Sequence, residues 1–490
     1  MIESSFKIIQ GGMGVGVSNW VLARSVARQG QLGVISGTGI AAVLARHLQT
    51  GDPGGHFRRA FDAFPYHNIA QRVWNRYFVL GGINTATPFK STPMPNIEFS
   101  RALEELTVLA AFSEVFLANE GHPGLVGINL LEKVQPPTLA TLFGAMLADV
   151  DYVLMGAGIP RFIPGVLDAL ARGEPVALKM DVEGADSGEN FDSHFNPTEF
   201  IARDGNSDHT SAPKLKRPMF FAIVSSATLA MTLARKSNGR VDGFVVETSV
   251  AGGHNAPPRG PLQLTATGEP VYGPRDDADL KKIAEIGLPF YLAGGFGTHA
   301  QLDWALSQGA AGIQVGTAFA FCQESGIRAD LKQRVLAIAA SGQATVFTDP
   351  QASPTGFPFK VVALPETMSD PDKYLQRERK CDLGYLRKVY KRPDGTPGYR
   401  CAAEPVADYV AKGGREEDTI GRKCLCNALF ATIGLAQVDA LGVSETAIVT
   451  AGDDVVNISR YIQPGKTSYS SADVLNQILH GSPVSHAALS

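Results

Sequence analysis

Short apolar runs alternate with longer amphipathic segments along the first two thirds of the chain. Glycine or proline bounds most of these runs, and a segment with helical periodicity follows most of them. This alternation is typical of βα units that build a parallel sheet. Runs with the strand pattern occur at residues 8–13, 31–37, 125–130, 152–155, 175–180, 218–226, 241–247, 289–295 and 312–317.

The fold class that accounts for this pattern is α/β, a TIM (β/α)8 barrel. Such a barrel has eight strands, and the chain offers nine candidates, so one of residues 152–155, 175–180 and 218–226 must lie outside it. The sequence does not distinguish among the three. The first barrel helix is expected at residues 19–29 with Ser18 as its N-cap, and a helical segment at residues 327–340 is expected to close the barrel.

Two regions interrupt or follow the barrel rhythm. After the second strand, helical patterns at residues 41–49, 57–77 and 101–119 predict a helical insertion, which could serve as a lid or as a subunit contact. The predicted divisions are a barrel over residues 1–37 and 124–347, the insertion over 38–123, and a C-terminal extension over 348–490.

Two stretches are expected to be irregular. Residues 181–217 are polar and acidic and predict a solvated loop, which could fold over the mouth of the site. Residues 348–365 carry four prolines and predict a linker or strap.

Small residues end the last three predicted strands. Glycines at strand tips let backbone N–H groups approach a phosphate, and the loops after strands seven and eight of a TIM barrel commonly form a phosphate site. A hydroxyl at a helix N-terminus adds to such a site. The predicted phosphate-binding residues are Gly252, Gly253, Gly294, Gly295, Gly316 and Thr317.

Four of these short segments carry a family resemblance. They are Ile-Gln-Gly-Gly-Met at residues 9–13, Ala-Gly-Gly-His at 251–254, Ala-Gly-Gly at 293–295, and Gln-Val-Gly-Thr-Ala-Phe at 314–319. Together they resemble the nitronate monooxygenase family, formerly 2-nitropropane dioxygenases, which are FMN-dependent barrels. The related flavin enoyl-acyl-carrier-protein reductases share the same segments, so the resemblance bears on fold and cofactor more than on substrate.

The resemblance implies roles for four residues. Gly12 and Met13 would lie beside the flavin ring, Asn129 would hydrogen-bond its pyrimidine edge, and His254 would act as catalytic base or orient the substrate. Each has a structural alternative: Met13 as a buried gap filler, Asn129 as a loop cap, and His254 as a brace for its loop.

Three further residues are candidates by position alone. Lys179 ends a predicted strand, where a cation could stabilise reduced flavin, although a solvated lysine or a salt-bridge partner fits the sequence equally well. Ser225 and Ser226 end the candidate strand at residues 218–226, just before the strand at 241–247, and are weaker candidates for cofactor contact.

The function expected from the resemblance is FMN-dependent oxidation of nitronates by molecular oxygen. One alternative is an NAD(P)H-dependent flavin enoyl-thioester reductase. Another is a flavin-binding accessory subunit without turnover. The expected partners are a small nitronate and O2, and self-association is left open.

Charge and hydropathy bear on the expected partners and location of the protein. A net charge of −4 gives no reason to expect nucleic acid, and no apolar run reaches the length of a membrane span. Glu3 stands where a signal peptide would carry basic residues, so the expected location is cytoplasmic.

The five cysteines are an odd number, which argues against a disulfide framework. Cys381, Cys401, Cys424 and Cys426 fall close together in the sequence without paired CxxC spacing. No metal is predicted there, and a four-thiolate zinc site is the alternative.

Overall fold

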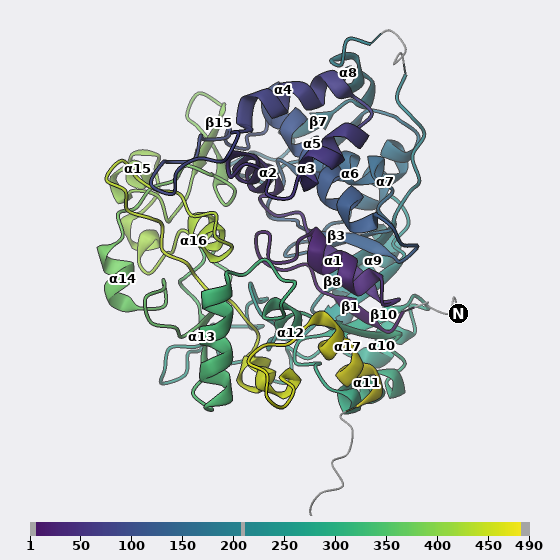
Figure 1. Ribbon diagram of the computed structural model, residues 1–490, viewed down its shortest axis with the longest axis vertical. Helices are drawn as coiled ribbons and strands as arrows, with labels where there is room; N and C mark the ends of the chain where they lie inside the picture. Colours follow the sequence, from purple (N-terminus) through teal and green to yellow (C-terminus); the bar gives the residue numbers. More distant parts are fainter. Residues whose placement is uncertain (1–5, 207–210, 482–490) are drawn as a thin grey trace, which may run out of the picture.

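Eight parallel strands form a closed barrel in this computed structural model, which describes residues 6–206 and 211–481 (Figure 1). The ring order is β1-β11-β10-β9-β8-β4-β3-β2. The predicted TIM barrel is therefore confirmed. Its strands are β1 (Ile8–Gln10), β2 (Leu32–Ser36), β3 (Val126–Leu131), β4 (Tyr152–Gly156), β8 (Met219–Val224), β9 (Gly243–Glu247), β10 (Phe290–Ala293) and β11 (Gly312–Val315).

The barrel interior is a packed core. Side chains from strands around the ring, among them Ile9, Leu154, Phe221 and Tyr291, form one buried apolar cluster. Phe221 and Tyr291 lie with ring centroids 5.9 Å apart. A filled interior leaves the loops at the strand ends as the place for a ligand.

The ninth candidate strand lies outside the barrel. β5 (Val176–Lys179) pairs antiparallel with β7 (Asp192–Phe195) in a separate two-stranded sheet. Its side chains alternate between buried and exposed, whereas most barrel strands are buried on both faces. This alternation explains why β5 suits a surface sheet.

The acidic segment is less irregular than predicted. It contains β6 (Val182–Glu183), β7 and α8 (Pro197–Ala202), because Asn196 caps α8 and β7 pairs with β5. Residues 207–210 of this segment lie outside the described residues, as do residues 1–5 of the predicted barrel and 482–490 of the predicted extension.

Four helices lie between β2 and β3. They are α2 (Ile40–Gln49), α3 (His56–Ala63), α4 (His67–Tyr77) and α5 (Arg101–Asn119). The single helix expected at residues 57–77 is two helices, since Pro65 stands between them and cannot continue the first. α5 packs against α1 (Trp20–Ala27), α6 (Thr138–Leu147) and β3, which is where a barrel helix following β2 would lie.

The N-cap of α1 is Asn19, whose side chain accepts from Leu22 N, and the expected N-cap Ser18 has another role. Its hydroxyl accepts from the backbone N of Met13 at 2.9 Å and donates to the carbonyl of Gly11 at 2.9 Å. Ser18 thus fixes the loop that follows β1.

The closing helix of the barrel comes from the far end of the chain. α17 (Ser471–His480) packs against both α1 and α11 (His299–Ser307), whereas α13 (Ala329–Ala340) packs on the 3-10 helix Asp453–Tyr461. The expectation that residues 327–340 close the barrel is wrong. A capping box at Ser470 and Asp473 starts α17, and buried Val474, Leu475 and Ile478 hold it in place.

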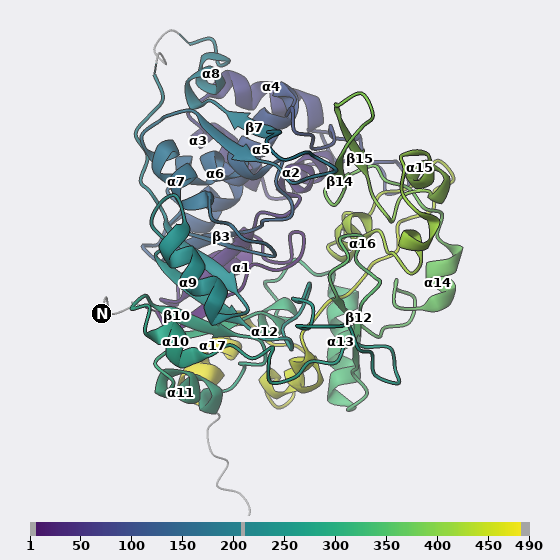
Figure 2. The ribbon, with the colours of Figure 1, turned by 180° about the vertical axis from the view of Figure 1, so that it is seen from behind.

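The segment between β11 and α17 stands largely to one side of the barrel, as both views show (Figures 1 and 2). Residues 348–365, expected as a linker, contribute to the antiparallel pair β12 (Val346–Asp349) and β13 (Phe359–Val362). A hairpin follows, formed by β14 (Lys388–Lys391) and β15 (Pro397–Arg400). The remaining helices are α7 (Ile163–Ala171), α9 (Ala227–Lys236), α10 (Leu280–Ala284), α12 (Thr317–Ala320), α14 (Pro371–Gln376), α15 (Val406–Ala411) and α16 (Leu425–Thr432).

Cys381, Cys401, Cys424 and Cys426 gather in one cluster beside α16. All are free thiols. Across residues 6–206 and 211–481, no group of three or more His, Cys, Asp or Glu is arranged to hold a metal ion. Over the same ranges, every helix is too short or too polar to cross a bilayer.

Candidate active site

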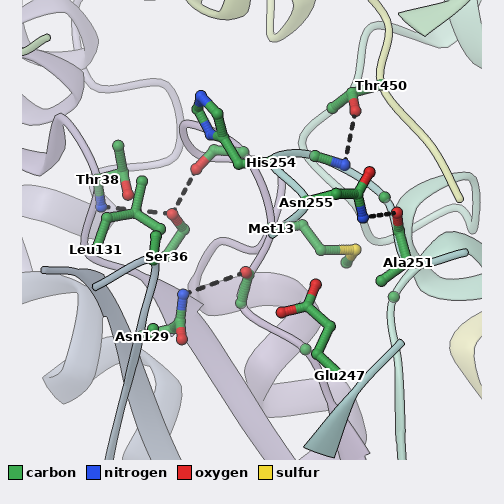
Figure 3. Close-up of a pocket in the computed structure, with 18 of the residues that line it drawn as sticks. Met13, Ser36, Thr38, Asn129, Leu131, Glu247, Ala251, His254, Asn255 and Thr450 are labelled. Carbon is green, nitrogen blue, oxygen red and sulfur yellow. Dashed lines mark hydrogen bonds between the residues drawn. The ribbon is translucent and has the colours of Figure 1, made fainter. Parts of the chain in front are cut away.

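A cavity of about 490 Å³ opens at the C-terminal ends of the barrel strands (Figure 3). This is the end at which TIM barrels carry their active sites, and the volume falls within the range of small-molecule and cofactor pockets. Loops after β1, β3, β9, β10 and β11 line it, together with residues from the segment between β11 and α17. The cavity thus joins two distant parts of the sequence.

One end of the cavity is formed by the tips of the seventh and eighth barrel strands, β10 and β11. Gly294 and Gly295 follow β10 with φ of +92° and +76°, and Gly316 precedes the short helix α12. A Cβ at Gly294 would lie far inside van der Waals distance of Thr248 Oγ1. Loops after strands seven and eight followed by a short extra helix are the usual phosphate site of this fold.

Residues 450–454, which we call the C-terminal strap, lie against these tips. The backbone N of Gly253 donates to Thr450 Oγ1 at 3.0 Å, and the backbone N of Gly452 donates to Thr317 Oγ1 at 2.9 Å. A Cβ at Gly252 would lie 2.7 Å from Gly452 N. The N–H of Gly253, expected to face a phosphate, therefore already has a partner within the protein, and the Thr317 hydroxyl already accepts one hydrogen bond.

The loop after β1 forms the neighbouring wall. Asn129, near the end of β3, donates from Nδ2 to the carbonyl of Gly12 at 3.5 Å (Figure 3). Gly12 is packed so tightly on Asn129 that a Cβ there would overlap the asparagine side chain. The Met13 side chain reaches to within 3.6 Å of where a Cβ on Gly316 would lie. Gly12, Met13 and Asn129 thus come together as expected.

Three buried polar atoms on the cavity wall lack a hydrogen-bond partner in the described part of the chain. They are Oε1 of Gln314, Oδ1 of Asn255 and Nζ of Lys133. A buried unpaired polar atom costs roughly 1–3 kcal/mol, and a bound ligand with polar groups would supply the missing partners. Such donors and acceptors, beside glycine tips that leave room for a phosphate, fit a flavin mononucleotide.

His254 lies on the cavity wall in the loop after β9. Its Nε2 is hydrogen-bonded to Oγ of Ser353 at 2.7 Å, and its ring packs edge-on against Phe359 with centroids 4.9 Å apart. Burial, with a smaller contribution from Lys133, lowers the pKa of His254 well below its usual value. The imidazole is therefore neutral at pH 7, and Figure 3 shows it turned away from Glu247.

Glu247 and Lys133 are the charged groups that the sequence reasoning missed. Glu247 is the last residue of β9, and burial raises its pKa to about 7. Lys133 lies two residues beyond β3, and burial lowers its pKa to about 7 against the opposing effects of Glu247 and Glu132. Position alone could have indicated Glu247, because a polar residue at the C-terminal end of a barrel strand is a candidate for catalysis.

Two candidates lie away from the cavity. Lys179 is exposed on β5, outside the barrel, and it is not on the cavity wall. The structure therefore does not bring Lys179 to this site, because the strand that carries it is the one that the barrel excludes. Ser226 instead caps α9 by accepting from Leu229 N at 3.2 Å, whereas Ser225 lines the cavity.

Another part of the cavity wall is apolar and comes from residues far along the sequence. We call it the distal wall, and its members are Phe357, Leu386, Leu425, Leu429, Phe430 and Ile448. Leu425 and Leu429 lie on α16. No motif marked these residues, since they form a surface only after the segment between β11 and α17 folds against the barrel.

The match to a known protein family falls mainly in the half of the barrel that contains β8 to β11. The family model for nitronate monooxygenase matches residues 200–354. The expected resemblance is confirmed. A probable nitronate monooxygenase of Bacillus subtilis (strain 168) is 34% identical over 115 residues, which are 23% of this chain and 31% of that protein. The match thus spans about a third of the relative's length, and the family model covers the part of this chain that contains β8 to β11.

Among the solved structures that resemble this chain are three with TM-scores below 0.5. FabK from Thermotoga maritima has 14% identity and a TM-score of 0.45, with 98% of this chain and 93% of that chain covered. The enoyl reductase domain of MlnA from Bacillus amyloliquefaciens has 11% identity and a TM-score of 0.46, with 97% and 94% covered. Nitroalkane oxidase from Streptomyces ansochromogenes has 15% identity and a TM-score of 0.38, with 73% and 76% covered.

Proposed function

We propose that this protein is an FMN-dependent oxidoreductase that oxidises nitronates with molecular oxygen. The observation that carries the proposal is the cavity at the ends of β10 and β11, whose glycine tips and unpaired polar atoms suit a flavin phosphate and ring. These two tips fall within the residues that match the nitronate monooxygenase family model.

The chain's own residues would hold the cofactor in two places. Gly294, Gly295 and Gly316 would receive the phosphate, with Gly252 and Thr317 beside them. Met13, Asn129 and Gln314 would contact the ring system. When bound, FMN supplies the electron acceptor for the substrate, and the protein binds and orients the substrate and limits access of water.

His254 would orient the substrate next to this cofactor. A neutral imidazole can accept a hydrogen bond or a proton, but it does not neutralise an anion. Its bond to Ser353 and its contact with Phe359 hold the ring in one orientation. A nitronate is already deprotonated, so its oxidation asks for a positioned substrate more than for a strong base.

A second candidate is reduction of an enoyl thioester with NAD(P)H. The apolar distal wall favours it, because six large apolar side chains exceed what a small nitronate needs to contact. An acyl chain would bury its methylene groups there, each gaining about 0.8 kcal/mol.

Anaerobic mixing of the FMN-loaded protein with propionate 3-nitronate or with NADPH separates the two candidates. Flavin absorbance that changes rapidly with the nitronate and not with NADPH supports nitronate oxidation. Bleaching by NADPH, followed by reoxidation on adding a crotonyl thioester, would overturn it in favour of the reductase. Stoichiometric FMN without response to either compound would indicate an accessory subunit.

A further inference from the structure

The ammonium group of Lys133 is the unusual feature of the cavity. Its Nζ is buried and has no hydrogen-bond partner among the described residues. It lies 3.8 Å from the centroid of the Phe357 ring, and the residue lines the same cavity as the strand tips. Lysine is almost never fully buried without a partner, so this position needs an explanation.

Three titratable groups, from the end of β3 and from β9 with its following loop, interact electrostatically with this amine. Glu247 approaches from the end of β9, Glu132 is the neighbouring residue after β3, and His254 stands in the loop after β9. Neither carboxylate hydrogen-bonds to Nζ, and the imidazole is neutral. The amine therefore has carboxylates nearby to favour its charge but keeps all three of its donor positions for something else.

We propose that Lys133 binds the anionic oxygen of the substrate, which for the proposed function is the negatively charged nitro group of a nitronate. This inference rests on the proposed function and names the residue that recognises the charge. The Phe357 face stabilises the ammonium by a cation–π contact, and the cavity shields it from water. An anion bound in the cavity would accept the hydrogen bonds that the ammonium group of Lys133 does not make within the protein.

A dependence of anion binding on pH follows from the surroundings. Burial lowers the pKa of Lys133 to about 7, so the free site loses its positive charge as the pH rises through that value. Glu247, with a pKa raised to about 7 by burial, gains a negative charge over the same range. Both changes weaken anion binding above pH 7, and the affinity for the anion should fall by about tenfold or more per pH unit.

Calorimetric titration with nitrite, a small nitrogen oxyanion, tests the inference without turnover. The FMN-loaded full-length protein, Lys133→Met, Lys133→Arg and the matched exposed variant Lys281→Met are titrated between pH 6 and 8.5. Wild type and Lys281→Met should bind most tightly at pH 6. Lys133→Met should bind at least tenfold more weakly at pH 6 and lose most of the pH dependence. Lys133→Arg should keep binding with a weaker dependence on pH, because arginine stays charged.

Equal nitrite affinity in wild type and Lys133→Met would overturn the inference, as would wild-type binding that is absent at pH 6 or unchanged up to pH 8.5. The proposed function fails separately. Nitrite binding that depends on Lys133, in a protein that does not oxidise nitronates, supports the anion site and rejects the monooxygenase. Nitronate oxidation with an unchanged KM in Lys133→Met supports the monooxygenase and rejects the role of Lys133.

Discussion

Two parts of the cavity wall differ in the groups that they present to a ligand. The tips of β10 and β11 offer backbone and glycine, held in place by the C-terminal strap, whereas the distal wall offers large apolar side chains from the segment between β11 and α17. The barrel fixes the backbone at the strand tips, and backbone N–H groups suit a phosphate whatever the substrate. Side chains from an added segment can differ freely, so the distal wall is where substrate choice is expected to lie.

The largest effect is expected from Gly294→Val at the strand-tip end. Its φ of +92° is strained for a β-branched residue by on the order of 1–3 kcal/mol, and its side chain would overlap Thr248. We expect FMN affinity at least tenfold lower, measured as flavin retained after gel filtration. Gly273→Ala, which has open space around it, should retain FMN. Full retention in Gly294→Val would remove the strand tips from the phosphate site.

Glu247→Gln, on the cavity wall, should change the pH dependence of stability. Because burial raises the pKa of Glu247 to about 7, the folded protein favours the protonated carboxyl. The stability that this carboxyl contributes to the folded state is complete below about pH 4.5 and is lost as the pH rises through about 7. The loss is on the order of 3 kcal/mol across that window. Urea unfolding at pH 5 and pH 8 should show this decline in wild type and in the exposed variant Glu285→Gln.

In Glu247→Gln the decline between pH 5 and pH 8 should be smaller, because the amide does not titrate. An unchanged decline would mean that Glu247 is ionised in the folded protein at pH 5, and the environment inferred for this side chain would be wrong.

Leu429→Ala tests whether the distal wall contacts the substrate. Removing this side chain from the wall loses roughly 1.5–3 kcal/mol of apolar contact if an acyl chain packs there. We then expect kcat/KM for a crotonyl thioester to fall about tenfold or more, with FMN retention and nitronate oxidation unchanged. Leu441→Ala, at a site where leucine is 89% exposed, is the control. A parallel loss of FMN would show that the two ends do not act separately.

The smallest effect is expected from Thr450→Val in the strap. This change removes the acceptor for the Gly253 N–H, at a cost of about 1 kcal/mol. FMN affinity measured by fluorescence titration should fall a few-fold. Thr450→Ser keeps the hydroxyl and should bind FMN like the wild type, so equal affinities in all three proteins would argue that the strap does not support the phosphate loops.

The sequence was informative where a local pattern determines structure. Barrel strands and strand-tip glycines follow from short apolar runs and from glycine's freedom at positive φ, whereas residues 12, 13 and 129 follow from the family resemblance. Predictions from local pattern were wrong where a segment packs or pairs with residues far along the chain. β5 resembles a barrel strand until its antiparallel pairing with β7 is seen, and Lys179 was misplaced with it.

The sequence by itself determined the barrel, the end at which a ligand binds and the resemblance to flavin enzymes, because alternating βα units and glycine tips are encoded within a few residues each. Only the tertiary structure decided that α17 closes the barrel, that the C-terminal strap meets the loops after β9 and β11, and that Lys133 and Glu247 share a cavity. These features depend on contacts between residues more than a hundred positions apart, and burial, which shifts both pKa values, exists only once those contacts form.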